Sequence, residues 1–330
     1  MPVSVHTFRS RLLEGNPLGD SPERRVPVYV PPGHVEGHRY PVLFALAGFT
    51  GTGVSFLNYD FYQPNLVELL DTLIVGGQMR PCVVVMVDAM TALGGNQYVD
   101  SSATGPWASH IVDELVPWAE ATLPVLPGRD HRGVFGKSSG GYGSLMMALE
   151  HADTFAAAAS HSGDAYFEYC YWLDFPAAID ALRRAGGLEG WFSSWRHHDR
   201  LSGAMFPAVN VVAMSAFYSP NPTSAHGFDL PFDLETGEVL SSVFARWKRR
   251  DPVELVGPRV SSLQSLKLLF FDCGARDEYN LHHGNRILHG RCLAAGVPHV
   301  YESFDDGHRG IGYRFKVSLP QLARVLSPEA

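Results

Sequence analysis

The amino-acid sequence predicts an α/β protein in which a mostly parallel central sheet is flanked by helices. Short apolar runs of strand length alternate with segments whose apolar residues recur at helical spacing, and this alternation is typical of such a sheet. The alternation stops between residues 164 and 264 and then resumes. We therefore expect one α/β core, formed by residues 1–163 and 265–330, with a large inserted cap at residues 164–264.

Composition and charge favour a globular enzyme. Hydrophobic residues make up 45% of the 330-residue chain and charged residues 18%, which allows a large core. The chain holds 26 Lys and Arg against 34 Asp and Glu, without a long basic run, so we expect no nucleic-acid partner. The start of the chain lacks a signal-like apolar stretch and the other apolar runs are of strand length, so we expect a cytoplasmic protein without membrane contact.

The four cysteines predict reduced, structural thiols. Cys82, Cys170, Cys273 and Cys292 lack the Cys-x-x-Cys spacing of metal and redox sites. Cys82 and Cys273 lie in or beside apolar runs, where a thiol packs like a small hydrophobic side chain. We therefore do not expect disulfide bonds.

The elements are predicted in order along the chain. An antiparallel hairpin at the periphery is expected from residues 7–13 and 24–30, which flank a turn-rich stretch. Buried strands are predicted at residues 41–46, 81–88, 132–135, 155–160, 266–272 and 299–304. Helices are predicted at residues 141–149, 280–295 and 313–326, and from residue 107 to about residue 123, where Pro117 should disturb the helix.

The inserted segment is too long to be a bare loop in a compact domain. Its first part is dense in aromatic residues, which predicts a cap with its own packing. A Thr236-Gly237 turn between short extended pieces predicts a small hairpin within residues 228–239.

The sequence Gly136-Lys137-Ser138-Ser139-Gly140 carries the clearest chemical signal. It matches G-x-S-x-G directly after an apolar run and directly before a helical pattern. A serine on such a sharp turn presents its hydroxyl outward, and the close backbone on either side requires glycine. We therefore identify Ser138 as the nucleophile of an α/β-hydrolase fold. A phosphate-binding P-loop is excluded because it needs glycine at position 131, where the chain has His131.

A serine hydroxyl needs a base and an acid that orients the base. In α/β-hydrolases the acid and then the histidine follow the serine along the chain. Asp277, in a loop just past an apolar run, is our candidate for the acid, with Asp272 and Glu278 as alternatives. His308, which follows the last predicted strand, is our candidate for the base. For His161 we expect a hydrogen-bonded structural role.

The reaction also needs two backbone N–H groups that stabilise an oxyanion. One is expected from Ser139, the residue after the nucleophile. The other is expected from the glycine-rich loop at residues 47–53, where Phe49 is our candidate.

Together these motifs resemble those of the putative esterase family of α/β-hydrolases, which includes esterase-D-like and enterochelin-esterase-like serine esterases. The resemblance spans most of the chain and rests on residues 28–33, 47–49, 136–143, 273–277 and 306–308. It implies a carboxylic ester hydrolase without metal or organic cofactor, with Ser138, Asp277 and His308 in the family's triad positions. Two positions differ from many relatives, which have His in place of Ala47 and His or Glu in place of Lys137.

The resulting hypothesis is a serine carboxylesterase that hydrolyses a small-molecule ester through an acyl-enzyme. The aromatic cap suggests an apolar or aromatic substrate group. Trp107, Tyr166 and Phe167 are pocket candidates, unless they form ordinary core. Lys137 is expected to be a solvated residue at the pocket rim, with contact to an anionic substrate group as the alternative.

Two other functions stay open from the sequence. One is an acyltransferase that uses the same triad with an alcohol or sugar acceptor. The other is a non-catalytic scaffold, which is disfavoured because no member of the triad is missing. The sequence also leaves open whether identical copies associate into a homo-oligomer.

Overall fold

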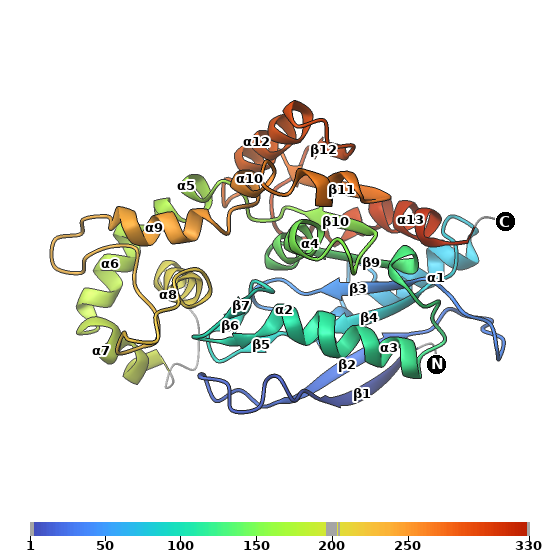
Figure 1. Cartoon of the computed structure of the whole chain (residues 1–330), viewed down its shortest axis with the longest axis horizontal. Helices are drawn as coiled ribbons and strands as arrows, with labels where there is room; N and C mark the ends of the chain where they lie inside the picture. The colour runs from blue at the N-terminus through green and yellow to red at the C-terminus, as the bar shows by residue number, and fades with distance from the viewer. Residues whose placement is uncertain (1–2, 196–202, 204, 329–330) are drawn as a thin grey trace.

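The computed structural model describes residues 3–195, 203 and 205–328 and confirms the predicted α/β class. An eight-stranded sheet with the order β1-β2-β4-β3-β9-β10-β11-β12 crosses the molecule (Figure 1). The pairings of β1 (Val3–Arg9) with β2 (Glu23–Tyr29) and of β2 with β4 (Val83–Val87) are antiparallel. All later pairings in this sheet, from β4 to β12, are parallel.

The parallel strands lie within two residues of the predicted apolar runs. Besides β4 they are β3 (Val42–Leu46), β9 (Arg132–Lys137), β10 (Ala157–His161), β11 (Leu268–Gly274) and β12 (Val300–Phe304). Two short ribbons follow β4, formed by β5 (Met90–Thr91) with β6 (Gly94–Gly95) and by β7 (Asp100–Ser101) with β8 (Gly105–Pro106).

Helices cover both faces of the sheet because successive strand side chains point to opposite sides. In β3, Phe44 packs in the core on one face, whereas Leu43 packs in the core on the other. The first face is covered by α4 (Ser139–Glu150) and α12 (Leu281–Ala294). The second is covered by α1 (Leu66–Val75) and α13 (Phe315–Leu326). The sheet is thereby buried on both sides, and the loops at its edge are free to form a site.

The helix predicted from residue 107 is irregular, as expected. It consists of α2 (Trp107–Ser109), a π-helical turn (His110–Leu115) and α3 (Val116–Thr122). Pro117 lies in the first turn of α3, where its missing N–H is tolerated.

The opening hairpin begins earlier than predicted. Its first strand covers residues 3–9 in place of the predicted 7–13. The chain leaves the sheet at Ser10 because the backbone amides of Arg11 and Leu12 donate to the Glu114 carboxylate, at 2.8 and 3.2 Å. The prediction was wrong because this carboxylate lies far away in the sequence.

Helices fill the connection between β10 and β11, in the region predicted as the cap. They are α5 (Phe167–Cys170), α6 (Phe175–Arg184), α7 (Gly187–Trp195), α8 (Phe206–Tyr218), α9 (Ser241–Lys248), α10 (Pro252–Leu255) and α11 (Val260–Gln264). Helices α6 to α9 form a lobe beyond one end of the sheet, opposite the two chain termini (Figure 1). Residues 196–202 and 204 of the predicted cap lie outside the described residues.

Aromatic side chains pack the interior of this lobe. Phe175 contacts Phe232, Phe244 and Trp247 with ring centroids 5.3 to 5.9 Å apart. The hairpin predicted within residues 228–239 is reduced to one bridge between Phe232 and Val239. Much of the aromatic content therefore stabilises the lobe itself.

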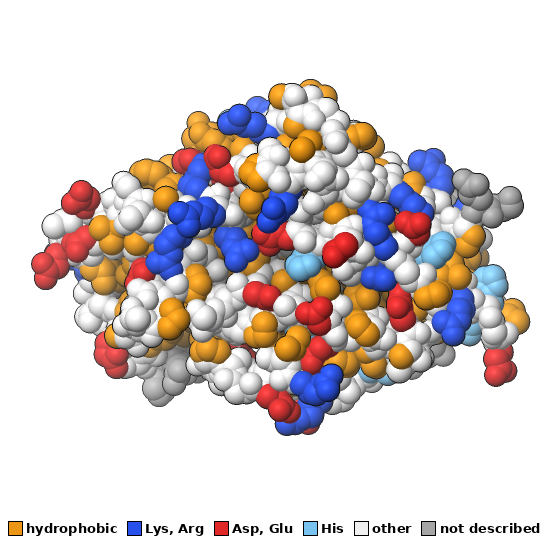
Figure 2. Space-filling view, viewed as in Figure 1, with side chains coloured by type: hydrophobic (Ala, Val, Ile, Leu, Met, Phe, Trp, Pro, Cys, Tyr) orange, Lys and Arg blue, Asp and Glu red, His pale blue; other side chains and the backbone are white. Residues whose placement is uncertain are grey.

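The described surface mixes charges of both signs. Figure 2 shows basic and acidic side chains interspersed over one face, with apolar patches between them. The four cysteines are free thiols and all are buried. Among the described residues, no helix is both long and apolar enough to cross a bilayer.

Candidate active site

Ser138 occupies the sharp turn between β9 and α4. Its backbone angles, φ 59° and ψ −126°, lie in a region that non-glycine residues rarely adopt. A Cβ atom on Gly136 would lie 2.6 Å from the carbonyl oxygen of Leu46, and one on Gly140 would lie 2.0 Å from the same atom. Both glycines of the motif are therefore required by the close approach of β3 to this turn.

His308 and Asp277 meet Ser138 at the same edge of the sheet. The Ser138 Oγ atom lies 2.9 Å from His308 Nε2, and His308 Nδ1 lies 2.8 Å from Asp277 Oδ2. Asp277 is 3% exposed and His308 is 6% exposed. The loops after β9, β11 and β12 thus bring a hydroxyl, an imidazole and a carboxylate into one line.

The environment of Asp277 keeps its carboxylate ionised. Burial disfavours the charge, but the hydrogen bond and charge of His308 and the backbone N–H of Tyr279 together hold the pKa of Asp277 below its ordinary value. An ionised Asp277 accepts a hydrogen bond from the Nδ1–H group of His308, which leaves Nε2 free to accept the hydroxyl proton of Ser138.

Two neighbours hold the imidazole in place. The Glu278 carboxylate accepts the backbone N–H of His308 at 2.6 Å. The Tyr279 ring packs edge-on against the imidazole with centroids 4.8 Å apart. Glu278, one of the two alternative acids, therefore contacts the backbone of the histidine loop, whereas Asp277 contacts the ring.

The other alternative acid, Asp272, belongs to a separate buried network. It accepts from His161 Nδ1 at 2.7 Å and from Arg314 Nε at 2.9 Å. His161 Nε2 lies 2.8 Å from Ser318 Oγ on α13. His161 is fully buried, and its carbonyl oxygen accepts the backbone N–H of Ser138 at 2.9 Å. His161 has the hydrogen-bonded structural role that its sequence position suggested.

The loop after β3 approaches the serine from the other side. It turns through a hydrogen bond from Gly51 N to Gly48 O of 2.9 Å, and the Phe49 carbonyl accepts from the amide of Gly95 at 2.5 Å. Phe49, Ser138 and Ser139 line the same cavity. Both predicted oxyanion residues therefore lie near Ser138.

A cavity of about 580 Å³ opens over Ser138 and His308. Its apolar lining comes from two parts of the molecule. The core contributes Phe49 and Leu281, and helix α8 of the lobe contributes Phe206 and Met214. Lys137 also contributes to the lining, and burial lowers its pKa. Among the described residues, no group of three or more metal-binding side chains is close enough to hold an ion.

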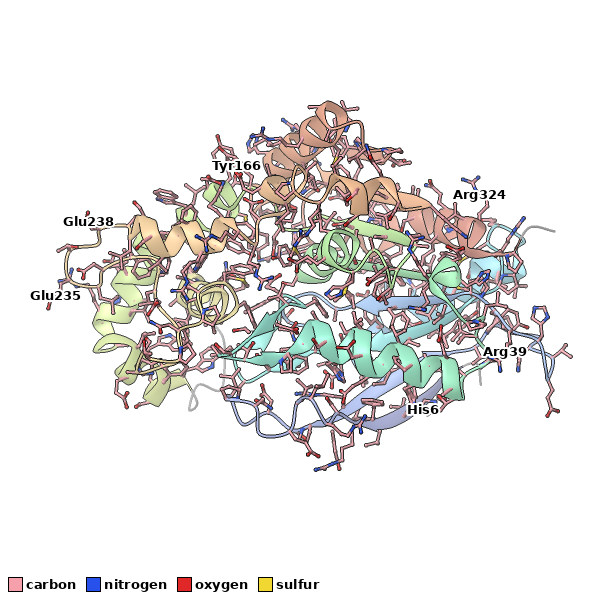
Figure 3. All side chains as sticks on the ribbon, viewed as in Figure 1. His6, Arg39, Tyr166, Glu235, Glu238 and Arg324 are labelled. Atoms are coloured by element: carbon pink, nitrogen blue, oxygen red, sulfur yellow. The ribbon has the colours of Figure 1, made fainter. Side chains whose placement is uncertain are left out.

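None of the three predicted aromatic pocket residues lines this cavity. Trp107 is fully buried, with the Arg24 guanidinium 4.7 Å from its ring centroid. Phe167 is fully buried and stacks on Tyr218. Tyr166 lies where α5 meets the start of α10 (Figure 3), and its amide donates to Asp251 at 3.0 Å. The structure corrects this prediction, because these rings pack in or beside protein core.

Several polar cavity residues were missed by sequence reasoning, among them Gln97, Asp164 and Asn210. Asp164 had a usable signal, since it lies three residues after the end of β10, at the sheet edge where Ser138 lies. Gln97 and Asn210 had no such signal in the sequence. Gln97 lies in an irregular segment, and Asn210 lies in helix α8, which is buried almost all round.

Known proteins share this architecture. A ferulic acid esterase superposes with a TM-score of 0.64 at 20% identity, covering 98% of both chains. An S-formylglutathione hydrolase from Agrobacterium tumefaciens superposes with a TM-score of 0.63 at 16% identity, covering 98% of this chain and 95% of the other. At these identities the likeness establishes the α/β-hydrolase fold.

Sequence relatives match a part of the chain. An esterase of Mycobacterium tuberculosis is 35% identical over 150 residues, which are 43% of this chain and 30% of the relative. The mouse S-formylglutathione hydrolase is 28% identical over 156 residues, 45% of this chain and 54% of the relative. The chain thus spans about a third to a half of these relatives' lengths.

The family model described as "Putative esterase" matches residues 21–324. This range runs from β2 into α13, which it covers except for its last two residues, and contains all the residues described above around Ser138. The chain therefore belongs to this esterase family.

Proposed function

We propose that the protein is a serine carboxylesterase that hydrolyses a small-molecule ester through an acyl-enzyme. The observation that carries this proposal is the hydrogen-bonded line from Ser138 through His308 to Asp277, with distances of 2.9 and 2.8 Å, at the floor of an open cavity. Membership of an esterase family and the names of the relatives support the same reaction class.

In the acylation step, Ser138 Oγ attacks the ester carbonyl carbon while His308 Nε2 takes its proton. Asp277 holds the Nδ1 proton and stabilises the imidazolium that forms. The C–O bond to the alcohol then breaks, and His308 returns the proton to the departing oxygen. Water then attacks the acyl carbon while the same nitrogen takes its proton. The bond from this carbon to Ser138 Oγ breaks, His308 returns the proton to Oγ, and the acid leaves.

The negative charge on the carbonyl oxygen needs preorganised donors. We assign this role to the backbone N–H groups of Phe49 and Ser139. Ser139 is the first residue of α4, so its N–H is one of the helix-terminal donors without a partner within the helix. Such a donor contributes about 10²-fold or more to the rate.

The test is hydrolysis of p-nitrophenyl acetate and butyrate by the wild-type protein and by Ser138→Ala. We expect kcat to fall by at least about 10³-fold in the variant, because the covalent route is lost. Equal rates in the two proteins, with circular dichroism showing the same fold, would refute the assignment of Ser138. Product analysis with an added acceptor alcohol distinguishes water from an alcohol as the second substrate.

A further inference from the structure

Asp164 is a buried carboxyl in the wall of the active-site cavity. It is 8% exposed and lines the cavity together with Ser138 and His308. The Tyr171 hydroxyl donates to its Oδ2 atom at 2.7 Å. Within the described residues no Lys or Arg forms an ion pair with it. Burial raises the pKa of Asp164 to about 6, although hydrogen bonds from Tyr171 and Gln97 and the charge interaction with His308 oppose the rise. The group is therefore mostly ionised at neutral pH without a Lys or Arg ion pair.

Gln97 supplies a second acceptor to the same wall. Its side chain is fully buried, and Nε2 donates to Ser139 Oγ at 3.0 Å. Its Oε1 atom is buried and has no hydrogen-bond partner among the residues that the structure describes. Leaving such an acceptor unpaired is costly. Gln97 and Asp164 therefore present an unpaired oxygen and an ionised carboxylate at one cavity, where a donor from a ligand would satisfy both.

We place the acyl part of the substrate in this region. The leaving alcohol takes its proton from His308 and then departs to solvent, so it lies toward the open side, where the next residue, Arg309, is exposed. The acyl group stays bound to Ser138 until water attacks. We therefore expect it to lie against the buried lining residues, which include Asp164, Tyr171 and Met214.

We propose that Asp164 and Gln97 determine specificity by selecting acyl groups that carry a hydroxyl, which donates a hydrogen bond to this pair of acceptors. This inference rests on the proposed esterase function. An acyl group without a donor leaves the Gln97 amide oxygen without a partner and the ionised Asp164 with only its protein donors in a desolvated cavity. A site built around a substrate hydroxyl discriminates strongly against such an analogue.

The experiment compares two matched pairs of p-nitrophenyl esters, butyrate with 3-hydroxybutyrate and phenylacetate with 4-hydroxyphenylacetate. We expect wild-type kcat/KM to favour the hydroxylated member of at least one pair by about tenfold or more, because the acceptor is charged. In Asp164→Asn, which keeps the shape and an acceptor for Tyr171, this ratio should fall toward one. Gln97→Met should lower it as well.

Asp229→Asn is the matched control. Asp229 is a carboxyl of the same lobe that binds Asn221 and Arg246, and it does not line the cavity; its substitution should leave the ratio unchanged. A wild-type ratio of one or less in both pairs, with good turnover, overturns the inference and leaves the esterase function intact. An unchanged ratio in both cavity variants also overturns it. Absence of turnover of every ester removes the proposed function and this inference with it.

Discussion

Two aspartates of one strand-and-loop segment each bind a histidine, and their surroundings give them different roles. Asp277 binds His308 and Asp272 binds His161, at 2.8 and 2.7 Å. The far nitrogen of His308 meets Ser138 at an open cavity, whereas that of His161 meets Ser318 in the closed core. The two Asp–His pairs make similar hydrogen bonds, but a substrate can reach only the Asp277–His308 pair. We therefore propose a catalytic role for this pair and a structural role for Asp272 and His161.

The substitution Asp277→Asn should lower kcat by about 10⁴-fold with little change in KM, because the amide favours the wrong tautomer of His308. Steady-state kinetics with p-nitrophenyl butyrate measure this effect.

The comparison variant Asp272→Asn leaves the active-site line intact. It should cost about 3 kcal/mol of unfolding free energy, since the fully buried charge that pairs with Arg314 is lost and Arg314 keeps only Glu302 as a charged partner among the described residues. We expect kcat to stay within about tenfold of wild type. A loss of kcat as large as that of Asp277→Asn, in folded protein, would contradict the separation of roles.

Ser138, Asp277 and His308 could be chosen from the sequence because each directly follows an apolar run, so strand direction places all three at one edge. Trp107 and Phe167 could not be judged in the same way. Trp107 lies at the first position of a predicted helix, and Phe167 lies in a segment without clear periodicity, so neither position shows on which face its ring packs. Asp164 was overlooked because a single acidic residue after a strand has no motif around it.

At the scale of elements, the turn from β9 into α4 depends on contact with β3. The substitution Gly140→Ala should destabilise the protein by about 3 kcal/mol or more and abolish esterase activity, because its Cβ would lie 2.0 Å from the Leu46 oxygen. Urea unfolding and ester hydrolysis measure the two effects.

Gly290→Ala provides the matched control in a second helix. Gly290 is exposed within α12, and nothing lies within 4 Å of its added Cβ. The free energy of unfolding of this variant should rise by about 0.5–1 kcal/mol, because alanine is the better helix former. A Gly140→Ala protein as stable and active as wild type would disprove the packing argument.

Whether the sequence predicts an element depends on the pattern that burial leaves in it. Strands buried on both faces appear as continuous apolar runs, and all six parallel strands were found within two residues. Helix α8 is buried almost all round and so has no polar face to reveal its period. The early exit of the first strand depends on Glu114, a contact that no local pattern encodes.

At the scale of the whole molecule, stability should depend on pH through buried carboxyls. Burial raises the pKa of both Asp164 and Asp251 to about 6. Between about pH 4 and pH 6 the folded state therefore holds protons that the unfolded state has released, so these groups contribute stability that is lost as pH rises.

Asp164→Asn removes one such group. Relative to wild type, its melting temperature should rise between pH 4.5 and pH 7.5, by an amount corresponding to at most about 3 kcal/mol. Differential scanning calorimetry at the two pH values tests this. Asp229→Asn should show almost no change over this range. Although partial burial opposes it, hydrogen bonds from Asn221 and Arg246 lower the pKa of Asp229, so its contribution to stability varies only at pH values below about 4. A pH-independent difference for Asp164→Asn would show that its charge has no energetic effect on folding.

All the lobe helices enter and leave through a single crossover between two adjacent strands, β10 and β11. Lengthening one connection adds little entropy cost, about 0.6 kcal/mol for each doubling. Evolution could therefore replace the segment between β10 and β11 by one of different length and chemistry. The loops that carry Ser138, Asp277 and His308 would keep their spacing. Selectivity and reactivity can evolve on separate stretches of the chain, and grafting a foreign segment between Gly163 and Leu268 is a rational route to new ester preferences.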